Sequence, residues 1–437
     1  MSTTVTDKSI TTDISLRVEN DLPSLPQAAA VRQEALAALR TLGLPAGKNE
    51  EYKYTPITRL LERNFNTATP NAAGTADAAA FAIAGLEGNV LVFVNGVYTP
   101  GQSRIVSPEN ELTILPLAEA FTHKSAVVAE HFAKYADHTT DAFAAWNTAA
   151  WKDGVFIEVS PNTLVETPVV IYHVHDTQNG QVLSTNRNLF VVGRSAAVTV
   201  VEKFDTAGTN NGFSNHVTEV VVAENAEFNL YSIQDDHGNR YHVGQTQIQQ
   251  SNSSRVNTYT FTLDGKLTRN NLHLSLDGEG IESHMYGLYL LEGDSIADNH
   301  TVADHKKPNS FSNEIYKGVL DAKSRGVFNG KIYVRPQAQK TNAFQANRNI
   351  LLTDTATINT KPQLEIWADD VKCSHGCTTG QLDEEALFYL RARGIPKDTA
   401  RAMMLYAFVG ELLDNVKHPV LREFLDGRVS DRLHKNF

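Results

Sequence analysis

Short apolar runs rich in β-branched residues dominate the chain between about residues 154 and 368. Gly, Asn and Asp residues separate these runs, as they do where tight turns join strands. No helical spacing of apolar residues interrupts this region. The pattern predicts strands at residues 155–159, 169–174, 189–192, 197–201, 217–222, 228–233, 255–263, 271–276 and 282–291.

A β-sandwich, a β-barrel and a β-solenoid all contain short strands at such spacing. The region is longer than a usual sandwich, and its strands are short and regularly separated. Many runs also lack clean alternation, as expected when one face lines a narrow core and the other packs against further structure. These features favour a solenoid, although the sequence has no tight repeat consensus.

Helical patterns flank the strand region on both sides. Residues 26–42 are rich in Ala and Leu and residues 117–150 are rich in Ala, which predicts helices. Between them, residues 89–98 predict a strand with a hairpin-type turn at Asn95-Gly96. We therefore expect a mainly helical region at residues 1–150, a β-solenoid core at residues 151–380 and a helical domain at residues 381–437.

The C-terminal part has clear helix signals. Asp383 can cap a helix that ends at Gly394, and Pro396 suits the first turn of a second helix. Met403, Met404 and Phe408 belong to a wide apolar stripe on that second helix. The stripe fits packing against the strand region, and it also fits a docking face for another subunit, because Met suits adaptable interfaces.

Composition narrows the function. The chain has 437 residues, of which 41% are hydrophobic and 20% charged, and a formal net charge of −11. This charge argues against binding to nucleic acid or to an anionic membrane surface. The first residues contain no apolar secretory segment, and no run approaches the length of a membrane span. We therefore expect a cytoplasmic protein whose two cysteines are free thiols.

Both cysteines, Cys373 and Cys377, flank His375 in one short segment. In an extended strand these three side chains share one face, each about 7 Å from the next. Thiolates and imidazoles bind iron, zinc and copper, but a closed zinc site needs four ligands and neighbours on one strand rarely converge on one ion. Two interpretations of the segment stay open: a partial site completed by a partner chain, or two buried cysteines and a core histidine bonded to a carbonyl.

Two other polar groups are weaker candidates. Asp369 and Asp370 are adjacent, so on a strand they face opposite sides, and we expect a turn or a solvated edge. Asp298, His300, Asp304 and His305 are residue types that could bind a metal, but Lys-Lys-Pro at residues 306–308 follows them and favours an exposed loop. The chain lacks a phosphate-binding loop, a nucleophile elbow and a dinucleotide fingerprint.

Residues 360–395 carry three motifs in close succession: Thr-Lys-Pro-Gln-Leu-Glu-Ile (360–366), Ala-Asp-Asp-Val-Lys-Cys-Ser-His-Gly (368–376) and Gly-Gln-Leu-Asp-Glu-Glu-Ala-Leu-Phe-Tyr-Leu-Arg-Ala-Arg-Gly-Ile (380–395). Others are Ser-His-Met-Tyr-Gly (283–287), Asp-Asn-His-Thr (298–301), Phe-Asn-Gly-Lys-Ile (328–332) and Glu-Glu-Tyr-Lys-Tyr-Thr (50–55). In these motifs the chain resembles the SufB/SufD family of scaffold proteins of the SUF iron–sulfur cluster assembly system.

The resemblance implies a mainly β fold, with a right-handed parallel β-helix core between N-terminal and C-terminal helical regions. It implies no enzymatic activity and no permanently bound cofactor. The implied partners are a SufB-like paralogue at the β-helix end and SufC, an ABC-type ATPase, on the C-terminal helices; the isolated chain could form a homodimer. The competing hypothesis is a solenoid carbohydrate-active enzyme that uses Asp369, Asp370 or His375.

The resemblance also implies roles for individual residues. His375 would help to hold a transient iron–sulfur cluster together with a cysteine of the SufB-like partner, and Cys373 lies beside it in the same motif. Cys377 has no implied role. The docking surface for SufC falls on Leu387, Tyr389, Met403, Met404 and Phe408.

Overall fold

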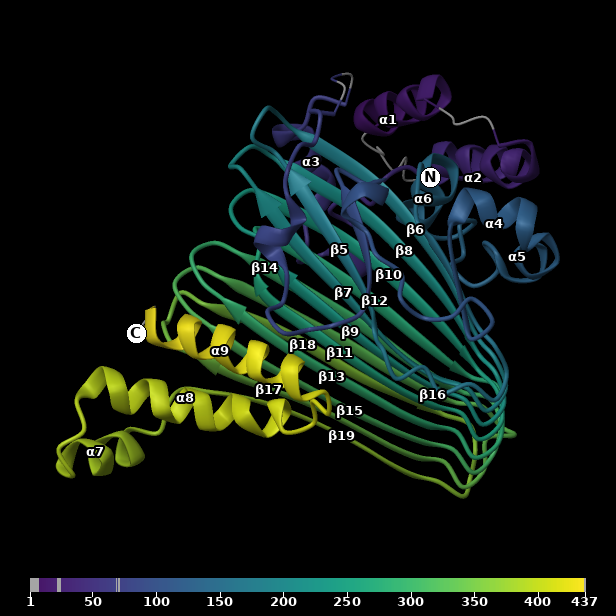
Figure 1. Ribbon diagram of the computed structural model, residues 1–437. Helices are drawn as coiled ribbons and strands as arrows, with labels where there is room; N and C mark the ends of the chain where they lie inside the picture. The colour runs from purple at the N-terminus through teal and green to yellow at the C-terminus, as the bar shows by residue number, and fades with distance from the viewer. Residues whose placement is uncertain (1–7, 22–24, 68, 70, 436–437) are drawn as a thin grey trace, which may run out of the picture.

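The strands of the middle region form two parallel sheets that face each other in a computed structural model, which describes residues 8–21, 25–67, 69 and 71–435 (Figure 1). Consecutive strands alternate between a 10-stranded sheet, here sheet A, and a 9-stranded sheet, here sheet B. Each strand therefore pairs with the strand two positions later. This arrangement is a parallel β-solenoid, and it confirms the preferred fold prediction.

Sheet A contains, after two strands of the N-terminal region, β5 (Val169–Asp176), β7 (Ala197–Ala207), β9 (Glu227–Asp235), β11 (Arg255–Asp264), β13 (Glu282–Leu291), β15 (Phe311–Leu320), β17 (Asn342–Leu351) and β19 (Lys372–Gly380). Sheet B contains, after one strand of that region, β4 (Val155–Val159), β6 (Val182–Val192), β8 (Gly212–Val222), β10 (Arg240–Gln250), β12 (Leu267–Leu276), β14 (Ile296–His305), β16 (Arg325–Val334) and β18 (Thr357–Ile366).

The two corners of each turn explain the regular Gly, Asn and Asp residues of the sequence. One corner holds a residue with positive φ at Ser195, Asn225, Ser253, Gly280, Asn309 and Lys340. The opposite corner does so at Gly180, Gly208, Gly238, Gly265, Gly293 and Ala322. Gly and Asn tolerate this left-handed conformation best, so the Gly and Asn residues between the apolar runs mark corners of the solenoid.

The register of the strands stacks equivalent residues in columns. Glu282 pairs with Phe311, which pairs with Asn342 and then Lys372, so one turn takes about 30 residues. At the start of the strands the inner columns are apolar and form the main core, with Val198, Phe228 and Val256 in one column. Further along, the inner columns become polar.

The N-terminal region adds both helices and strands. Its helices are α1 (Lys8–Asp21), α2 (Ala29–Leu42), α3 (Ile57–Asn64), α4 (Leu117–His123), α5 (Ser125–His131) and α6 (Ala142–Ala150), and α6 packs on β6 and β8. Its strands β1 (Asn89–Val94), β2 (Val97–Tyr98) and β3 (Leu112–Pro116) extend the two sheets. Asn95 and Gly96 both have positive φ between β1 and β2, which confirms the predicted hairpin turn.

Three helices complete the C-terminal part: α7 (Glu384–Ala392), α8 (Lys397–Leu413) and α9 (Pro419–Lys435). Asp383 caps α7, since its side chain accepts hydrogen bonds from two backbone N–H groups, and Pro396 precedes α8 as predicted. α8 and α9 share one apolar cluster with the outer face of sheet A (Figure 1). That cluster contains Leu405, Val409, Leu421 and Leu425 from the helices and Tyr259 and Leu288 from the strands.

Candidate functional site

The last turn of the solenoid is open. β19 pairs only with β17, and β18 only with β16, so each has a second edge that no strand of the described chain covers. No residue of β18 or β19 is fully buried, whereas earlier strands are mostly buried. Exposed strand edges present a row of unpaired N–H and C=O groups to which another chain can add.

Cys373, His375 and Cys377 lie on the inner face of β19, at this open end. The register of β19 pairs them with three buried inner residues of β17, which are Ala343, Gln345 and Asn347. His375 is exposed and the cysteines are half-buried, because no later turn covers them. The prediction that the three side chains share one face is therefore confirmed.

The two cysteines are protonated thiols in this setting. Burial raises the pKa of Cys373, which packs against the main core. Burial also raises the pKa of Cys377, although a hydrogen bond with Thr360 on the facing strand β18 opposes this effect. Since the thiolate is the form that binds metal, an incoming metal ion has to displace the thiol proton here.

A polar platform lies directly beneath these residues. Under His375, the Gln345 Nε2 donates a hydrogen bond to Glu314 Oε2 at 2.7 Å, and burial raises the pKa of Glu314 to about 7. Under Cys377, Asn347 donates to Tyr289 Oη at 3.0 Å. These interactions fix the inner residues of β17, so the open end is a preformed surface.

Exposed apolar side chains surround the open end, and the sequence analysis missed them. Phe344 is 36% exposed, Ile366 is 39% exposed and Trp367 is 48% exposed. The local pattern gives no signal for them, because aromatic and aliphatic residues in a strand are equally consistent with a core position. Together with the free strand edges they form a surface suited to another protein.

The C-terminal helices carry a second exposed apolar surface. Tyr389 on α7 is 59% exposed and Met403 on α8 is 47% exposed, as a docking role requires. Leu387 is only 4% exposed, so its side chain belongs to the helix core and the expectation that it contacts a partner needs correction. Phe388, which the sequence analysis left out, is 71% exposed.

The remaining two predicted docking residues lie between core and surface. Met404 and Phe408 are half-buried. Phe408 packs against the outer face of sheet A, with the Lys317 Nζ 4.8 Å from its ring centre. One side of α8 therefore packs on the solenoid, as one interpretation of its stripe predicted, and the side with Met403 faces outward.

The Asp298–His305 cluster is not an exposed loop, and that prediction was wrong. These residues lie on β14, where alternation places His305 on the opposite face from Asp298, His300 and Asp304. Asp298 is buried and bonded to Arg269 at 2.6 Å and to His300 at 2.9 Å. Asp304 pairs with Arg335 instead, and His305 bonds to Ser312. The pairing of each acid with its own neighbours indicates a structural role.

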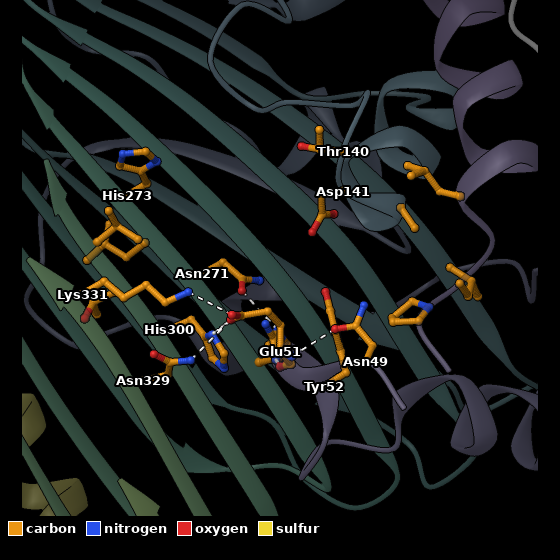
Figure 2. Close-up of a pocket in the computed structure, with 18 of the residues that line it drawn as sticks. Asn49, Glu51, Tyr52, Thr140, Asp141, Asn271, His273, His300, Asn329 and Lys331 are labelled. Carbon is orange, nitrogen blue, oxygen red and sulfur yellow. Dashed lines mark hydrogen bonds and ion pairs between the residues drawn. The ribbon is translucent and has the colours of Figure 1, made fainter. Parts of the chain in front are cut away.

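Glu51, from the Glu-Glu-Tyr-Lys-Tyr-Thr motif, fastens the N-terminal connector to the solenoid. It pairs with His300 at 3.2 Å and with Lys331 at 2.9 Å across a cavity of about 680 Å³ on the outer face of sheet B (Figure 2). The hydrogen bond with His300 lowers the pKa of Glu51 to about 2. The charged groups in the cavity thus pair with one another, and the motif joins two parts of the fold.

Asp369 and Asp370 lie in the bend between β18 and β19, and both are exposed. The backbone of Asp370 bonds to Gln339 and Lys340 of the preceding turn. This matches the predicted turn, and the structure gives the two carboxylates no shared geometry for acid–base chemistry.

The fold and the site define a class of protein: a parallel β-solenoid with helical ends, whose open end carries soft ligands on its inner face. Comparison with known families specifies the class. Residues 173–408 match the SufBD core domain of SUF system FeS cluster assembly, and residues 20–171 match the SufBD protein N-terminal region. The chain belongs to the SufBD family of iron–sulfur cluster assembly proteins.

Individual relatives agree with this assignment. An iron–sulfur cluster assembly SufBD family protein of Synechocystis is 33% identical over 88% of this chain and 86% of its own length. The iron–sulfur cluster assembly protein SufD of Escherichia coli is 30% identical over 92% of both chains. These relatives favour the scaffold hypothesis over the carbohydrate-active enzyme. In the part of the chain that the structure describes, no helix is long and apolar enough to cross a membrane.

Proposed function

We propose that this chain is a cytoplasmic scaffold subunit that pairs through its open end with a SufB-like paralogue and docks a SufC-type ATPase on its C-terminal helices. The observation that carries the proposal is the pair of free strand edges on β18 and β19, with His375 and Cys373 on the inner face of β19. A paralogue with the same solenoid would add its own strands to these edges.

The ligand set at the open end supports a shared, transient cluster. One strand supplies His375 and Cys373, which are too few and too spread to enclose a cluster. A cysteine of the partner, facing the same surface, would complete the set. In this proposal the cluster is bound only transiently and leaves the scaffold, and the chain itself catalyses no reaction that forms a bond.

The exposed surface of α7 and α8 supports the docking of an ATPase. Phe388, Tyr389 and Met403 present aromatic and thioether groups, which are favoured at the centre of protein interfaces. α8 also contacts β13 and β15, so a force on the helices reaches the strands of the solenoid directly. ATP-driven approach of two ATPase subunits would in this way strain the paired solenoids and expose the ligands.

The first experiment tests the paired complex. The tagged chain is purified anaerobically from its source cell, and co-purifying proteins, iron and sulfide are measured. We expect a SufB-like chain and an ABC-type ATPase to be recovered together. Recovery of the chain alone, or as a homodimer only, would contradict the proposal.

The second experiment tests His375. His375→Ala should leave the complex and its circular dichroism intact but reduce iron and sulfide per complex at least several-fold. Ser374→Ala is the matched control, because Ser374 is also exposed on β19 but faces the outside. Equal cluster content in the two variants would remove His375 from the site.

The third experiment tests the docking surface. Tyr389→Glu and Met403→Glu should each weaken recovery of the ATPase, while the SufB-like chain is retained. Glu423→Lys, on an exposed position of α9, is the control for a change of charge on the same helical domain. If both surface variants retain the ATPase, docking lies elsewhere.

A further inference from the structure

We infer that His173, Glu202 and His216 form a buried site for a divalent transition-metal ion inside the solenoid, far from its open end. The three residues come from β5, β7 and β8, in the first turns of the solenoid (Figure 1). The His216 Nε2 lies 3.0 Å from Glu202 Oε1, and the His173 Nε2 lies 3.6 Å from the same oxygen. All three ligand atoms lie within 4.8 Å of one another.

These separations suit one shared ion. Zinc binds imidazole nitrogen and carboxylate oxygen at about 2.0–2.2 Å, which places neighbouring ligands of a tetrahedral ion about 3.3 Å apart. The observed separations of 3.0 and 3.6 Å lie on either side of this value. Small rotations of the two imidazoles would therefore be enough to bind an ion.

Glu202 is a buried carboxylate with no Lys or Arg side chain bonded to it in the described chain. Other buried acids nearby have one: Glu219 pairs with Arg187, and Asp205 pairs with Lys203. The side chain of Glu202 is 3% exposed, and it is hydrogen-bonded to Asn188 and His216. Burying a negative charge without a positive partner is costly, and a bound cation would supply that partner.

His173 points at the same place with an unsatisfied atom. Its side chain is only 5% exposed, and its Nε2 has no hydrogen-bond partner in the described chain. The ring is held between two aromatic rings, with centres 4.7 Å from Phe204 and 5.4 Å from Phe93. A nitrogen fixed in this way toward a carboxylate, without a proton acceptor in bonding geometry, is what a metal ligand requires.

Asn188 supports the same geometry from the facing sheet. Its Oδ1 accepts a hydrogen bond from the backbone N–H of Val155 at 3.0 Å, which fixes the orientation of the amide. Its Nδ2 therefore donates to Glu202 Oε1 at 2.8 Å. Such outer contacts hold ligating carboxylates in place in metal sites.

A small cavity next to the cluster can hold the remaining ligands. It has a volume of about 30 Å³ and is lined by Glu202, His216, His242 and Gln234, among others. This volume accommodates about two water molecules. Three protein ligands and one or two waters give the four or five coordination positions that such ions use.

The ligand types select the class of ion. Two imidazoles and one carboxylate suit Fe²⁺ or Zn²⁺, whereas Mg²⁺ and Ca²⁺ prefer oxygen ligands alone. The site also differs from the open end in position. The inner column of sheet A that starts at Glu202 runs through Ser232, Thr260, Gly287, Tyr316 and Asn347 before it reaches Cys377. Because the site is closed, we expect the ion to enter while the turns fold around it.

The experiment measures metal in the purified full-length chain and after refolding with Zn²⁺, Fe²⁺ or Mg²⁺ under anaerobic conditions. We expect about one equivalent of Zn²⁺ or Fe²⁺ per chain and no retained Mg²⁺. X-ray absorption should show nitrogen and oxygen ligands without sulfur. A chain that retains neither ion, or an ion with sulfur ligands, would overturn the inference.

Variants locate the ion. Glu202→Gln and His216→Asn should each reduce retained metal at least tenfold. The double variant Cys373→Ser with His375→Ala should keep the full equivalent, since it changes only the open end. This result would separate the inference from the proposed function, which predicts the opposite pattern for the cluster. If the buried variants do not fold, the absorption spectrum of the unmodified chain still decides between the two sites.

Discussion

Glu314 allows a direct test of how much a negative charge in the interior of the solenoid lowers the stability of the fold. Its side chain is buried on the inner face of β15, accepts a hydrogen bond from Gln345 and has no cationic partner in the described chain. Burial raises its pKa from 4.5 to about 7. The native protein therefore keeps the proton up to nearly neutral pH, while the unfolded chain releases it above pH 4.5.

This difference gives the stability a predictable pH dependence. Between pH 4.5 and about 7, ionisation lowers the free energy of the unfolded state while the native state keeps the proton. The free energy of unfolding therefore falls as the pH rises. A pKa difference of about 2.5 corresponds to about 3 kcal/mol. The stabilising effect of the raised pKa is complete below pH 4.5 and is lost as the pH rises through about 7.

Glu314→Gln removes this dependence, because an amide of the same shape cannot ionise. We expect the free energy of unfolding of the variant, relative to the unmodified chain, to rise by about 3 kcal/mol between pH 4.5 and pH 8. Urea unfolding followed by circular dichroism measures both proteins at several pH values, and groups that titrate in both cancel in the difference.

The control for this measurement is Glu224→Gln, which removes one exposed carboxylate at a corner of the solenoid without touching the interior. If the difference between Glu314→Gln and the unmodified chain stays constant across this pH range, then Glu314 is already ionised in the native state. That result would mean that a cation or water relieves its burial.

Three further changes test other parts of the fold by urea unfolding. A Cβ at Gly287 would lie 2.1 Å from an aromatic ring, so Gly287→Ala should lower the free energy of unfolding by about 1–3 kcal/mol. Gly376→Ala lies in open space and should change it little, and equal effects of the two variants would contradict this packing. Glu219→Ala leaves a fully buried arginine of β6 unpaired and should cost about 3–5 kcal/mol, and a cost near zero would mean that the ion pair is dispensable. His300 lowers the pKa of Glu51 to about 2, so the stability that Glu51 contributes is present above pH 4.5 and is lost toward pH 2. Glu51→Gln should therefore lower the free energy of unfolding at pH 7 and lower it less at pH 3. A loss of equal size at both pH values would refute the pairing.

The comparison of sequence and structure separates local signals from non-local ones. Asp383, Pro396 and the Asn95-Gly96 turn act within a few residues, through capping bonds and backbone conformation, and each was predicted correctly. The face shared by Cys373, His375 and Cys377 was also predictable, because alternation along a strand needs no knowledge of the rest of the fold.

The local sequence pattern does not specify which distant strands pair with one another. The prediction that placed Asp298 and His300 in an exposed loop failed because the following Lys-Lys-Pro suggested solvent, while the true neighbours of these residues are Arg269 and Glu51. Leu387 was expected at the docking surface because of the family resemblance, which assigns a helical domain to the partner but does not say which side of each helix the rest of that domain covers.

The sequence by itself determined short strands separated by corner residues, with helical patterns on both sides, and it favoured a solenoid over a sandwich or a barrel, because these signals are encoded locally. Only the tertiary structure decided which side chains meet inside it. The register of pairing brings His173, Glu202 and His216 together from three strands, and within the described chain it leaves one edge each of β18 and β19 free at the open end. Both results depend on contacts between residues far apart in the chain, which no local pattern specifies.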